Sequence, residues 1–465
     1  MPVSVWVRAF FREVMKRKRD RKITFCMAVL LIASSLMACG KTAASGGETD
    51  TASAFESASS EDVSVTSEEE NDQEGAEEAK DASGREDQAE AEKASEEDQA
   101  GESGEDGIVS KNPEMRNITA QQVVSEMKIG WNLGNTLDST NGNLMKSMPA
   151  VNWETAWGNP ETTKELIDTV IDSGFQVIRI PVSWNDHIMV AENYKIQESW
   201  MDRVQEVVDY AYENGAYVIL NTHHEDWYAT YYDKEEQSEK VLTAVWEQIA
   251  ERFRDYDEHL IFEGLNEPRK KGTSVEWNGG DQEGWDVVND LNRVFVETVR
   301  KSGGNNEDRI LMIPGYAANC FEGMRHVEIP EQRGKIIVSV HAYEPYDFAL
   351  NKQGRGTWDN DTSNIDAIMQ SIDELFLSKG IPVIIGEFGA MYKNVKGNEE
   401  ERAAWAKYYV STAAKKGIPC IWWDNGAFEG DGELFGLIDR ESCEWKYPLI
   451  VKALKEGAEA ADIGG

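Results

Sequence analysis

The feature that most constrains the fold is an alternation of short apolar runs with amphipathic helical patterns. Eight runs rich in Val, Ile and Leu span residues 128–135, 176–184, 216–224, 260–267, 309–316, 335–343, 382–389 and 419–426. Near-continuous apolar strands of this kind are typical of parallel sheets that are buried on both faces. Eight such strands joined by right-handed helical crossovers predict a single closed (β/α)8 barrel, an α/β fold of the TIM type.

The predicted helices have recognisable ends. In residues 159–174, Thr162 and Glu165 predict a capping box, and Gly174 predicts the end of the helix. Further helical patterns cover residues 196–215, 238–256, 285–303, 365–380, 399–417 and 447–456. After the fifth apolar run, only a short turn around residues 319–323 is predicted.

The first residues have the pattern of an export signal. A basic stretch precedes an apolar run over residues 23–37, which is shorter than the roughly 20 residues of a membrane-spanning helix. Residues 1–38 are therefore predicted to be a signal peptide of the lipoprotein type. The sequence LMACG at residues 36–40 resembles a bacterial lipobox, in which Cys39 would carry the lipid. An ordinary secreted protein is the alternative.

The next segment differs sharply in composition. Residues 41–107 contain 23 acidic and four basic side chains and one aromatic residue, Phe55, so they cannot bury enough apolar surface to fold. Residues 39–107 are predicted to be a lipid-anchored, disordered acidic linker, and residues 108–465 to be the barrel domain. We expect the protein on the outer face of the cell membrane, or secreted.

Charge and cysteine content exclude several classes of partner. The net charge of −38 disfavours nucleic acid and any membrane contact other than a lipid anchor. Outside the leader and lipobox, three cysteines remain, Cys320, Cys420 and Cys443. They allow one disulfide, which the sequence does not identify. No spacing of Cys and His indicates a zinc site, so neither a metal nor a cofactor is predicted.

The apolar strands end in an unusually polar set of residues. These are Asn132, Asn135, Arg179, His223, His224, Asn266, Glu267, His341, Tyr343, Glu387 and Trp423. In a (β/α)8 barrel the carboxyl ends of the strands converge on one mouth, which carries the chemistry. Glu267 and Glu387 end the fourth and seventh strands, so they should face each other there. Two carboxyl groups across a gap are what glycoside hydrolysis requires.

Seven motifs in chain order then define a resemblance. They are GWNLGNTLD (130–138), IRIPVSW (178–184), NTHHE (221–225), GLNEP (264–268), HAYEP (341–345), IGEFG (385–389) and WWDNG (422–426). The chain resembles glycoside hydrolase family 5 from about residue 115 to 456, and most of all its bacterial endo-β-1,4-glucanase branch, which includes xyloglucanases and lichenases. The resemblance implies a retaining, endo-acting cellulase that cleaves β-1,4-glucosidic bonds by double displacement.

The resemblance also implies roles for individual residues. Glu267 matches the acid/base, with a raised pKa, and Glu387 matches the nucleophile. Asn266 would bind the sugar 2-hydroxyl, Arg179 and Tyr343 would contact Glu387, and His341 would orient the acid/base or the sugar. The remaining assignments are His223 as the family histidine of the third strand, His224 behind it, Trp423 as the floor of the cleaved subsite, and Asn132 at a neighbouring subsite.

Aromatic residues near the loops suggest how a polymer would bind. Sugars stack on aromatic rings, and Trp157, Trp184, Trp227, Trp277, Trp285 and Trp358 all follow predicted strands. As a group they favour a long open groove, although each can instead pack in the core.

Several alternatives stay open at this point. A metal-dependent barrel hydrolase is disfavoured because the first strand lacks the expected His pair. An inactive carbohydrate-binding surface lipoprotein is disfavoured because both carboxylates are present. The expected partner is a β-glucan bound by a monomer. Cellulose leads, mixed-linkage glucan and xyloglucan follow, and an endo-β-1,4-mannanase is the alternative. The oligomeric state and the pH optimum are left undetermined.

Overall fold

The computed structural model describes residues 115–142, 144 and 146–460. The predicted signal peptide, Cys39 and the acidic linker lie outside the described residues. Within the described part, no helix is both long and apolar enough to cross a membrane. Cys320, Cys420 and Cys443 are free thiols, which answers the question of a disulfide among these three residues.

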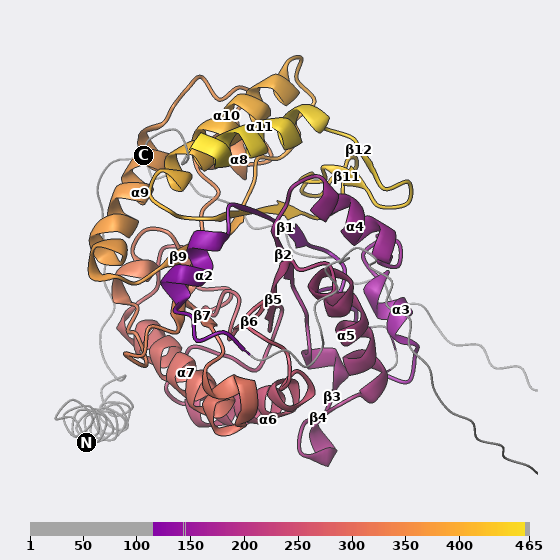
Figure 1. Ribbon diagram of the computed structural model, residues 1–465, viewed down its shortest axis with the longest axis vertical. Coiled ribbons are helices and arrows are strands. Elements are labelled where there is room, and N and C mark those ends of the chain that lie inside the picture. Colours follow the sequence, from indigo (N-terminus) through magenta and orange to yellow (C-terminus); the bar gives the residue numbers. More distant parts are fainter. Residues whose placement is uncertain (1–114, 143, 145, 461–465) are drawn as a thin grey trace, which may run out of the picture. The chain divides into compact units, whose positions relative to one another are not determined.

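Eight parallel strands close into a barrel, as predicted (Figure 1). They are β1 (Ile129–Leu133), β2 (Val177–Ile180), β5 (Tyr217–Asn221), β6 (Leu260–Glu263), β7 (Leu311–Asn319), β8 (Ile336–His341), β9 (Val383–Phe388) and β10 (Cys420–Asp424). Their order around the barrel is β1-β10-β9-β8-β7-β6-β5-β2, and β1 pairs with β2 to close the ring. Each strand lies within one of the eight predicted apolar runs, or within three residues of its end.

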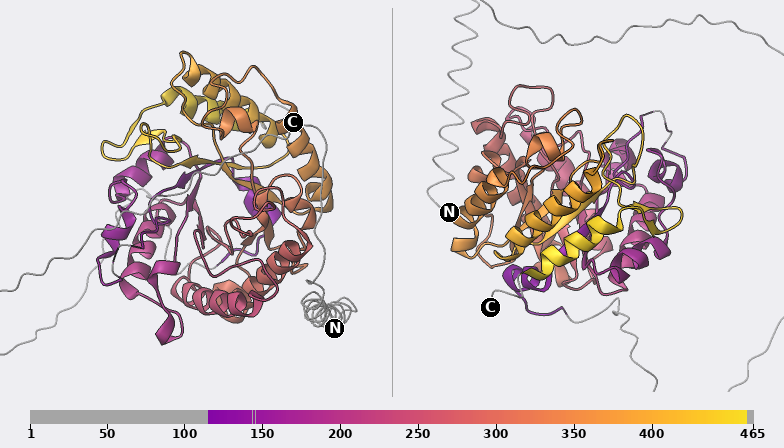
Figure 2. Two further views of the ribbon diagram at one scale, coloured as in Figure 1. Left: turned by 180° about the vertical axis from the view of Figure 1, so that it is seen from behind. Right: turned by 90° about the horizontal axis from the view of Figure 1, so that it is seen from above.

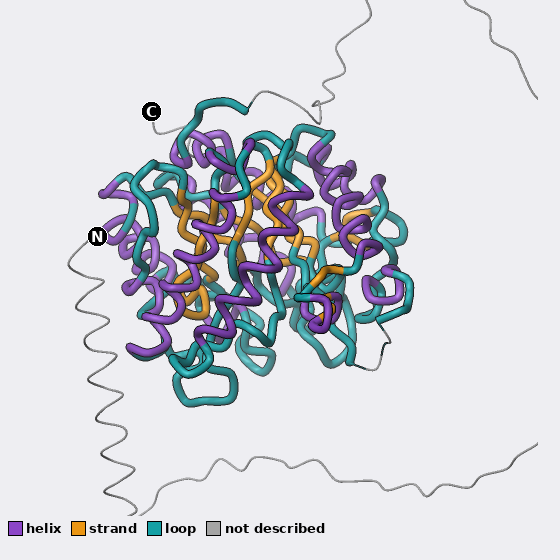
Figure 3. The backbone as a smooth tube through the Cα atoms, turned by 90° about the horizontal axis from the view of Figure 1, so that it is seen from below, coloured by secondary structure: helices purple, strands orange, loops and turns teal. Residues whose placement is uncertain are grey.

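Helices surround the barrel (Figure 2), and the strands lie inside this layer (Figure 3). The long ones are α4 (Lys164–Asp172), α5 (Glu198–Tyr212), α6 (Glu235–Arg252), α7 (Gln282–Lys301), α9 (Ser363–Leu375), α10 (Asn398–Ala414) and α11 (Pro448–Ala458). After β7, only the short 3-10 helix η4 (Gly323–His326) follows, close to the predicted turn. All seven long helices were predicted, because their apolar residues recur at helical spacing.

The start of α4 differs from the prediction. Thr163 caps the helix, and its hydroxyl accepts a hydrogen bond from the backbone N–H of Leu166. Thr162 is instead buried, and its backbone N–H donates to the Glu154 carboxylate at 2.7 Å. The capping box of Thr162 and Glu165 was therefore wrong by one residue, because a tertiary contact with Glu154 fixes the entry of the chain.

Several short elements had no clear signal in the sequence. They are α2 (Ala120–Glu126), α3 (Ala150–Glu154), α8 (Tyr346–Ala349), the strand pairs β3 (Ile188–Met189) with β4 (Lys195–Ile196) and β11 (Ile438–Asp439) with β12 (Glu444–Trp445), and the 3-10 helices η1 (Asn185–His187), η2 (Val190–Glu192), η3 (Gly304–Glu307) and η5 (Leu377–Lys379). Most of them are shorter than the window over which periodicity can be recognised.

The barrel interior has an apolar layer and then a polar layer. Inward-facing residues such as Val177, Ile219 and Ile261 form one buried cluster with Val123 and Val124 of α2, which covers the amino end of the barrel. Because side chains of a strand alternate, the next inward positions lie two residues further along. On these strands and β8 they are all polar and buried: Arg179, Asn221, Glu263 and Ser339. The polar layer forms the base of the mouth.

Candidate active site

The guanidinium of Arg179 lies at the centre of the polar layer and is fully buried. Its Nε donates to Glu263 at 2.7 Å, and its Nη1 donates to Glu387 at 2.8 Å. Nη1 also donates to the Asn132 side-chain oxygen at 2.9 Å, and Nη2 to that of Asn266 at 2.7 Å. Burial alone would lower the pKa of Arg179, but the charges of Glu263 and Glu387 raise it. One cation thus connects residues from β1, β2, β6 and β9.

Glu387 receives hydrogen bonds at both carboxylate oxygens. Arg179 binds Oε1, and the Tyr343 hydroxyl donates to Oε2 at 2.9 Å, so both expected contacts are present. Burial raises the pKa of Glu387, and the charges of His341 and Arg179 oppose this shift without cancelling it. The two donors leave little freedom for the carboxylate, which is fixed at the end of β9.

Glu267 lies opposite, where its Oε1 is 2.8 Å from His341 Nδ1. Burial alone would raise the pKa of Glu267, but the hydrogen bond and charge of His341 outweigh it and lower this pKa. The expected raised pKa of Glu267 is therefore wrong for the ligand-free protein. His341 has a raised pKa, because the negative charges of Glu387 and Glu267 exceed the opposing effect of its burial.

His341 brings the two carboxylates together. Its Nδ1 is also 3.6 Å from Glu387 Oε2. One oxygen of each carboxylate and one ring nitrogen of His341 lie within 4.8 Å of one another. Retaining glycosidases have carboxyl groups about 5 to 5.5 Å apart, whereas inverting ones need about 6.5 to 9.5 Å. The geometry therefore fits retention.

Glu263 is a member of the site that the sequence analysis missed. It is fully buried and accepts hydrogen bonds from Arg179 at 2.7 Å, from Asn221 Nδ2 at 3.2 Å and from the Ser339 hydroxyl at 2.7 Å. Its signal was an acidic residue inside an apolar strand, two positions after the inward-facing Ile261. The Glu263 carboxylate pairs with Nε of the buried Arg179, whereas Glu387 pairs with Nη1.

The two histidines after β5 have different environments. His223 is buried, with Nδ1 at 3.1 Å from Asn221 Nδ2 and Nε2 at 3.4 Å from Asn266 Nδ2. Its burial lowers the pKa well below the usual value, which keeps the ring neutral. The His224 side chain is 39% exposed and packs between His223 and Trp157. Because β5 ends at Asn221, the chain carries His224 to the rim, and its supporting role beside His223 stays a prediction.

Asn132 also differs from its expected role. It is fully buried, its side-chain oxygen accepts from Arg179, and its amide donates to the Gly386 carbonyl at 3.0 Å. Both polar ends are thus occupied inside the barrel, so Asn132 does not reach a sugar subsite. Trp423 lies above this layer with 7% exposure, parallel to the His223 ring at a centroid distance of 5.7 Å.

The loop tryptophans divide into three groups. Trp157 and Trp277 are exposed, at 40% and 56%. Trp227 and Trp285 are half-buried. Trp184 and Trp358 are buried in the core, so they offer no face to a ligand. For these last two the alternative stated above, packing in the core, is the one observed.

Two groups of residues at the mouth have the donor types of a metal site. Asp138, His223 and His224 form one, and Glu267, His341 and Glu387 the other, each with ligand atoms within 4.8 Å. In the first group the His223 nitrogens already face amide groups, and in the second the contacts between the three residues account for the arrangement. Neither group needs an ion to explain its geometry.

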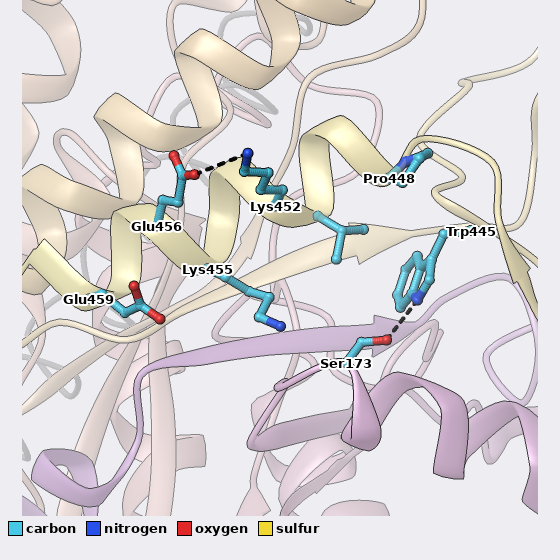
Figure 4. Close-up of a pocket in the computed structure, with 8 residues that line it drawn as sticks. Ser173, Trp445, Pro448, Lys452, Lys455, Glu456 and Glu459 are labelled. Atoms are coloured by element: carbon cyan, nitrogen blue, oxygen red, sulfur yellow. Dashed lines mark hydrogen bonds and ion pairs between the residues drawn. The ribbon is translucent and has the colours of Figure 1, made fainter.

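A separate cavity of about 350 Å³ lies on the outer wall of the barrel, against α11 (Figure 4). Ser173, Trp445 and Lys455 are among its lining residues, and the Trp445 indole N–H donates to the Ser173 hydroxyl at 2.7 Å. Because Ser173 precedes the start of β2, this cavity lies toward the amino ends of the strands, away from the mouth.

The sequence matches a known hydrolase family. Residues 138–429 match the family model described as Cellulase (glycosyl hydrolase family 5). The chain belongs to glycosyl hydrolase family 5, so the resemblance stated above is confirmed.

Named relatives are similar over most of the chain. Endoglucanase B of Neocallimastix patriciarum is 50% identical over 353 residues, which cover 74% of this chain and 72% of the relative. Endoglucanase 1 of Ruminococcus albus is 47% identical over 349 residues, covering 75% of this chain and 84% of the relative.

Solved structures of endoglucanases and lichenases are also similar to this chain. A GH5-4 broad specificity endoglucanase from Ruminococcus champanellensis with bound cellotriose has a TM-score of 0.71 and 47% identity, covering 74% of this chain and 99% of that one. A family 5 lichenase from Caldicellulosiruptor sp. F32, as a mutant with cellotetraose, has a TM-score of 0.70 and 44% identity, covering 76% and 98%.

Glu263→Gln tests the charge balance around Arg179. Gln keeps an oxygen for Arg179 and Asn221, and its amide can donate to the Ser339 hydroxyl, so the shape is preserved. With one negative charge removed, the positive charge of Arg179 acts more strongly on Glu387 and lowers its pKa. We expect the acid limb of the pH profile of kcat/KM to move to lower pH, by about one unit. An acid limb that stays in place or moves to higher pH would contradict this balance.

Proposed function

We propose that the chain is a retaining endo-β-1,4-glucanase in which Glu267 is the acid/base and Glu387 the nucleophile. The observation that carries the proposal is the approach of these two carboxylates and His341 to within 4.8 Å at the mouth of a family 5 barrel. This separation suits direct attack by one carboxylate on the anomeric carbon, without an intervening water molecule.

In the first step, Glu387 attacks the anomeric carbon and forms an ester bond to the sugar. The bond between that carbon and the glycosidic oxygen breaks, and Glu267 gives its proton to the departing oxygen. Arg179 and Tyr343 hold the attacking carboxylate in place through hydrogen bonds at 2.8 and 2.9 Å.

In the second step, water takes the place of the departed sugar. Glu267, now ionised, removes a proton from the water, which attacks the anomeric carbon and releases Glu387. Two displacements at one carbon retain its configuration. Because the Asn266 side-chain oxygen is bound to Arg179, its amide nitrogen is the group left to donate to the sugar 2-hydroxyl.

His341 supports the acid/base Glu267. In the free enzyme the neighbouring carboxylates raise the pKa of His341, and its Nδ1 lies 2.8 Å from Glu267 Oε1. A bound glucan chain excludes water from the mouth, and this further burial favours the neutral form of Glu267. The contact with His341 Nδ1 at 2.8 Å holds the Glu267 carboxyl in one orientation at the mouth. His341 is thereby a positioning residue for the acid.

The substrate class follows from the family and its named members. The similar proteins are called endoglucanases, and similar structures hold cellotriose or cellotetraose. A β-1,4-glucan is therefore the substrate we assign, with mixed-linkage glucan and xyloglucan as related polymers. Trp423, His223 and His224 would line the side of the mouth that holds the cleaved sugar.

The parts of the chain outside the barrel belong to the same proposal. Residues 1–38 would direct export, Cys39 would carry a lipid, and residues 39–107 would tether the catalytic domain of residues 108–465. The enzyme would then act on polymer at the outer face of the membrane. The composition of these segments supports this arrangement.

Release of reducing sugar tests the function and the polymer together. The full chain and Glu387→Gln should be compared on carboxymethylcellulose, barley β-glucan, xyloglucan and galactomannan. We expect rapid release from at least one glucan and a loss of at least about 10³-fold in the variant, since the amide cannot act as the nucleophile. Near-normal activity of Glu387→Gln would remove this residue as nucleophile, and activity on galactomannan alone would make the enzyme a mannanase.

Glu267→Ala separates the acid from the nucleophile. A substrate with a poor leaving group needs the proton, so we expect kcat/KM on barley β-glucan to fall by about 10²- to 10⁴-fold. β-Cellobiosyl fluoride has a leaving group that depends much less on a proton, so its first step should be affected far less. An equal loss on both substrates would argue against the acid role.

A further inference from the structure

The loop between β6 and α7 carries an arginine that touches the acid/base and an exposed indole at once. Arg269 Nη1 lies 3.6 Å from Glu267 Oε2 and donates to the Glu267 backbone carbonyl at 2.9 Å. Its Nε donates to Glu276 at 3.1 Å. The guanidinium carbon stands 4.1 Å from the centroid of the Trp277 ring. These contacts fix the planar group in one orientation.

Trp277 has one covered face and remains largely exposed. Arg269 lies over one side of the ring, while the residue as a whole is 56% exposed. The rest of the indole surface is open, and an aromatic face of this kind can stack on a ligand. The guanidinium is well suited to hold it, because it stacks on an aromatic face more readily than an ammonium group does.

The backbone around Trp277 is anchored against β7. Gly279 and Gly280 have φ values of 85° and 91°, and a Cβ atom on Gly280 would lie 2.7 Å from the Tyr316 ring. The Trp285 indole N–H donates to the Gly279 carbonyl at 2.7 Å, and Asn319 Nδ2 donates to the Trp277 carbonyl at 3.4 Å. The indole therefore projects from a firmly packed loop.

Glu267 also determines which side of the scissile bond this loop serves. The acid protonates the oxygen that leaves, so the leaving sugar lies on the Glu267 side of the mouth. Arg269 and Trp277 follow Glu267 in the chain and touch it directly or through one contact. Trp423, on β10, and His223, after β5, form a separate stacked pair of rings.

We propose that Arg269 is a positioning residue that holds the Trp277 indole as the stacking platform for the leaving sugar, beside the acid/base Glu267. This inference rests on the proposed function and adds a specificity determinant to it. A glucan chain that fills the platform brings its glycosidic oxygen to the carboxyl that protonates it. The positive charge of Arg269 also helps to lower the pKa of Glu267.

Two substrates that differ only on the leaving side test the proposal. Cellotetraose needs the platform, whereas β-cellobiosyl fluoride releases a fluoride ion that cannot stack on it. For Trp277→Ala we expect kcat/KM on cellotetraose to fall about tenfold, mainly through KM, as for loss of one aromatic stacking contact. Hydrolysis of the fluoride should stay within about twofold of the parent, because no stacking contact is lost there.

Arginine variants separate the platform from the charge. In Arg269→Met, kcat/KM on cellotetraose should fall about as much as in Trp277→Ala. In the double variant it should fall little further, because the two residues act as one unit. Without the cation the pKa of Glu267 rises, so the alkaline limb of the pH profile should move to higher pH in Arg269→Met. Arg269→Lys keeps the charge, so the alkaline limb should stay in place. Its kcat/KM on cellotetraose should lie between those of the parent and Arg269→Met, because Lys stacks less well on the indole.

Lys271→Met is the matched control. Lys271 lies in the same loop with the same charge, but its side chain is 49% exposed and faces Asp226 at 3.2 Å. The substitution should leave kcat/KM on both substrates within about twofold of the parent, since Lys271 touches neither Glu267 nor Trp277. Equal losses on cellotetraose and fluoride, or fully additive losses in the double variant, would overturn the proposal. Failure of the proposed function would give a different result, because the Glu387→Gln variant would then keep its activity.

Discussion

The buried guanidinium of Arg179 is the group on which both the barrel interior and the reaction centre depend. A charge removed from water is tolerated only when it is paired and its donors are satisfied. Here Glu263 and Glu387 supply the negative charge, and Asn132 and Asn266 accept the remaining hydrogen bonds. The ion pair that makes the polar layer stable is thus the same one that orients the proposed nucleophile.

The apolar layer below explains why the Arg179 side chain is held so firmly. Ile261 and its inward-facing neighbours pack against α2 at the amino end, and the polar residues come two positions later on the same strands. Strand alternation therefore delivers Arg179 and Glu263 to one level of the barrel. Residues placed on strands are held more firmly than residues on loops, which suits a catalytic pair.

The sequence predicted the barrel well because each of its strands is an apolar run and each long helix has a 3.6-residue period. It predicted Glu267, Glu387, Arg179, His341 and Tyr343 as neighbours, because all of them end or follow strands whose carboxyl ends must converge. Contacts between distant segments were not predictable in this way. Glu154 moved the α4 cap from Thr162 to Thr163, and Glu263 was hidden inside an apolar run.

Side-chain depth was the other limit. Asn132 and His224 both have side chains that can bind a sugar. Only the fold determines that the Asn132 oxygen is bound to Arg179 and that His224 lies at the rim. The same holds for the tryptophans, since Trp184 and Trp277 both lie in loops that follow strands and have opposite exposures. The position of Arg269 over Trp277 depends on a loop conformation that no local pattern specifies.

The central claim is that Glu387 attacks the sugar directly and forms an ester with it. The most direct measurement is the mass of the intact enzyme and its peptides after treatment with 2,4-dinitrophenyl 2-deoxy-2-fluoro-β-cellobioside, which slows the second step more than the first. The account predicts one fluorocellobiosyl group per chain, bound to Glu387 and absent in Glu387→Gln. Turnover with inversion and no adduct, or an adduct on another carboxylate, would contradict it.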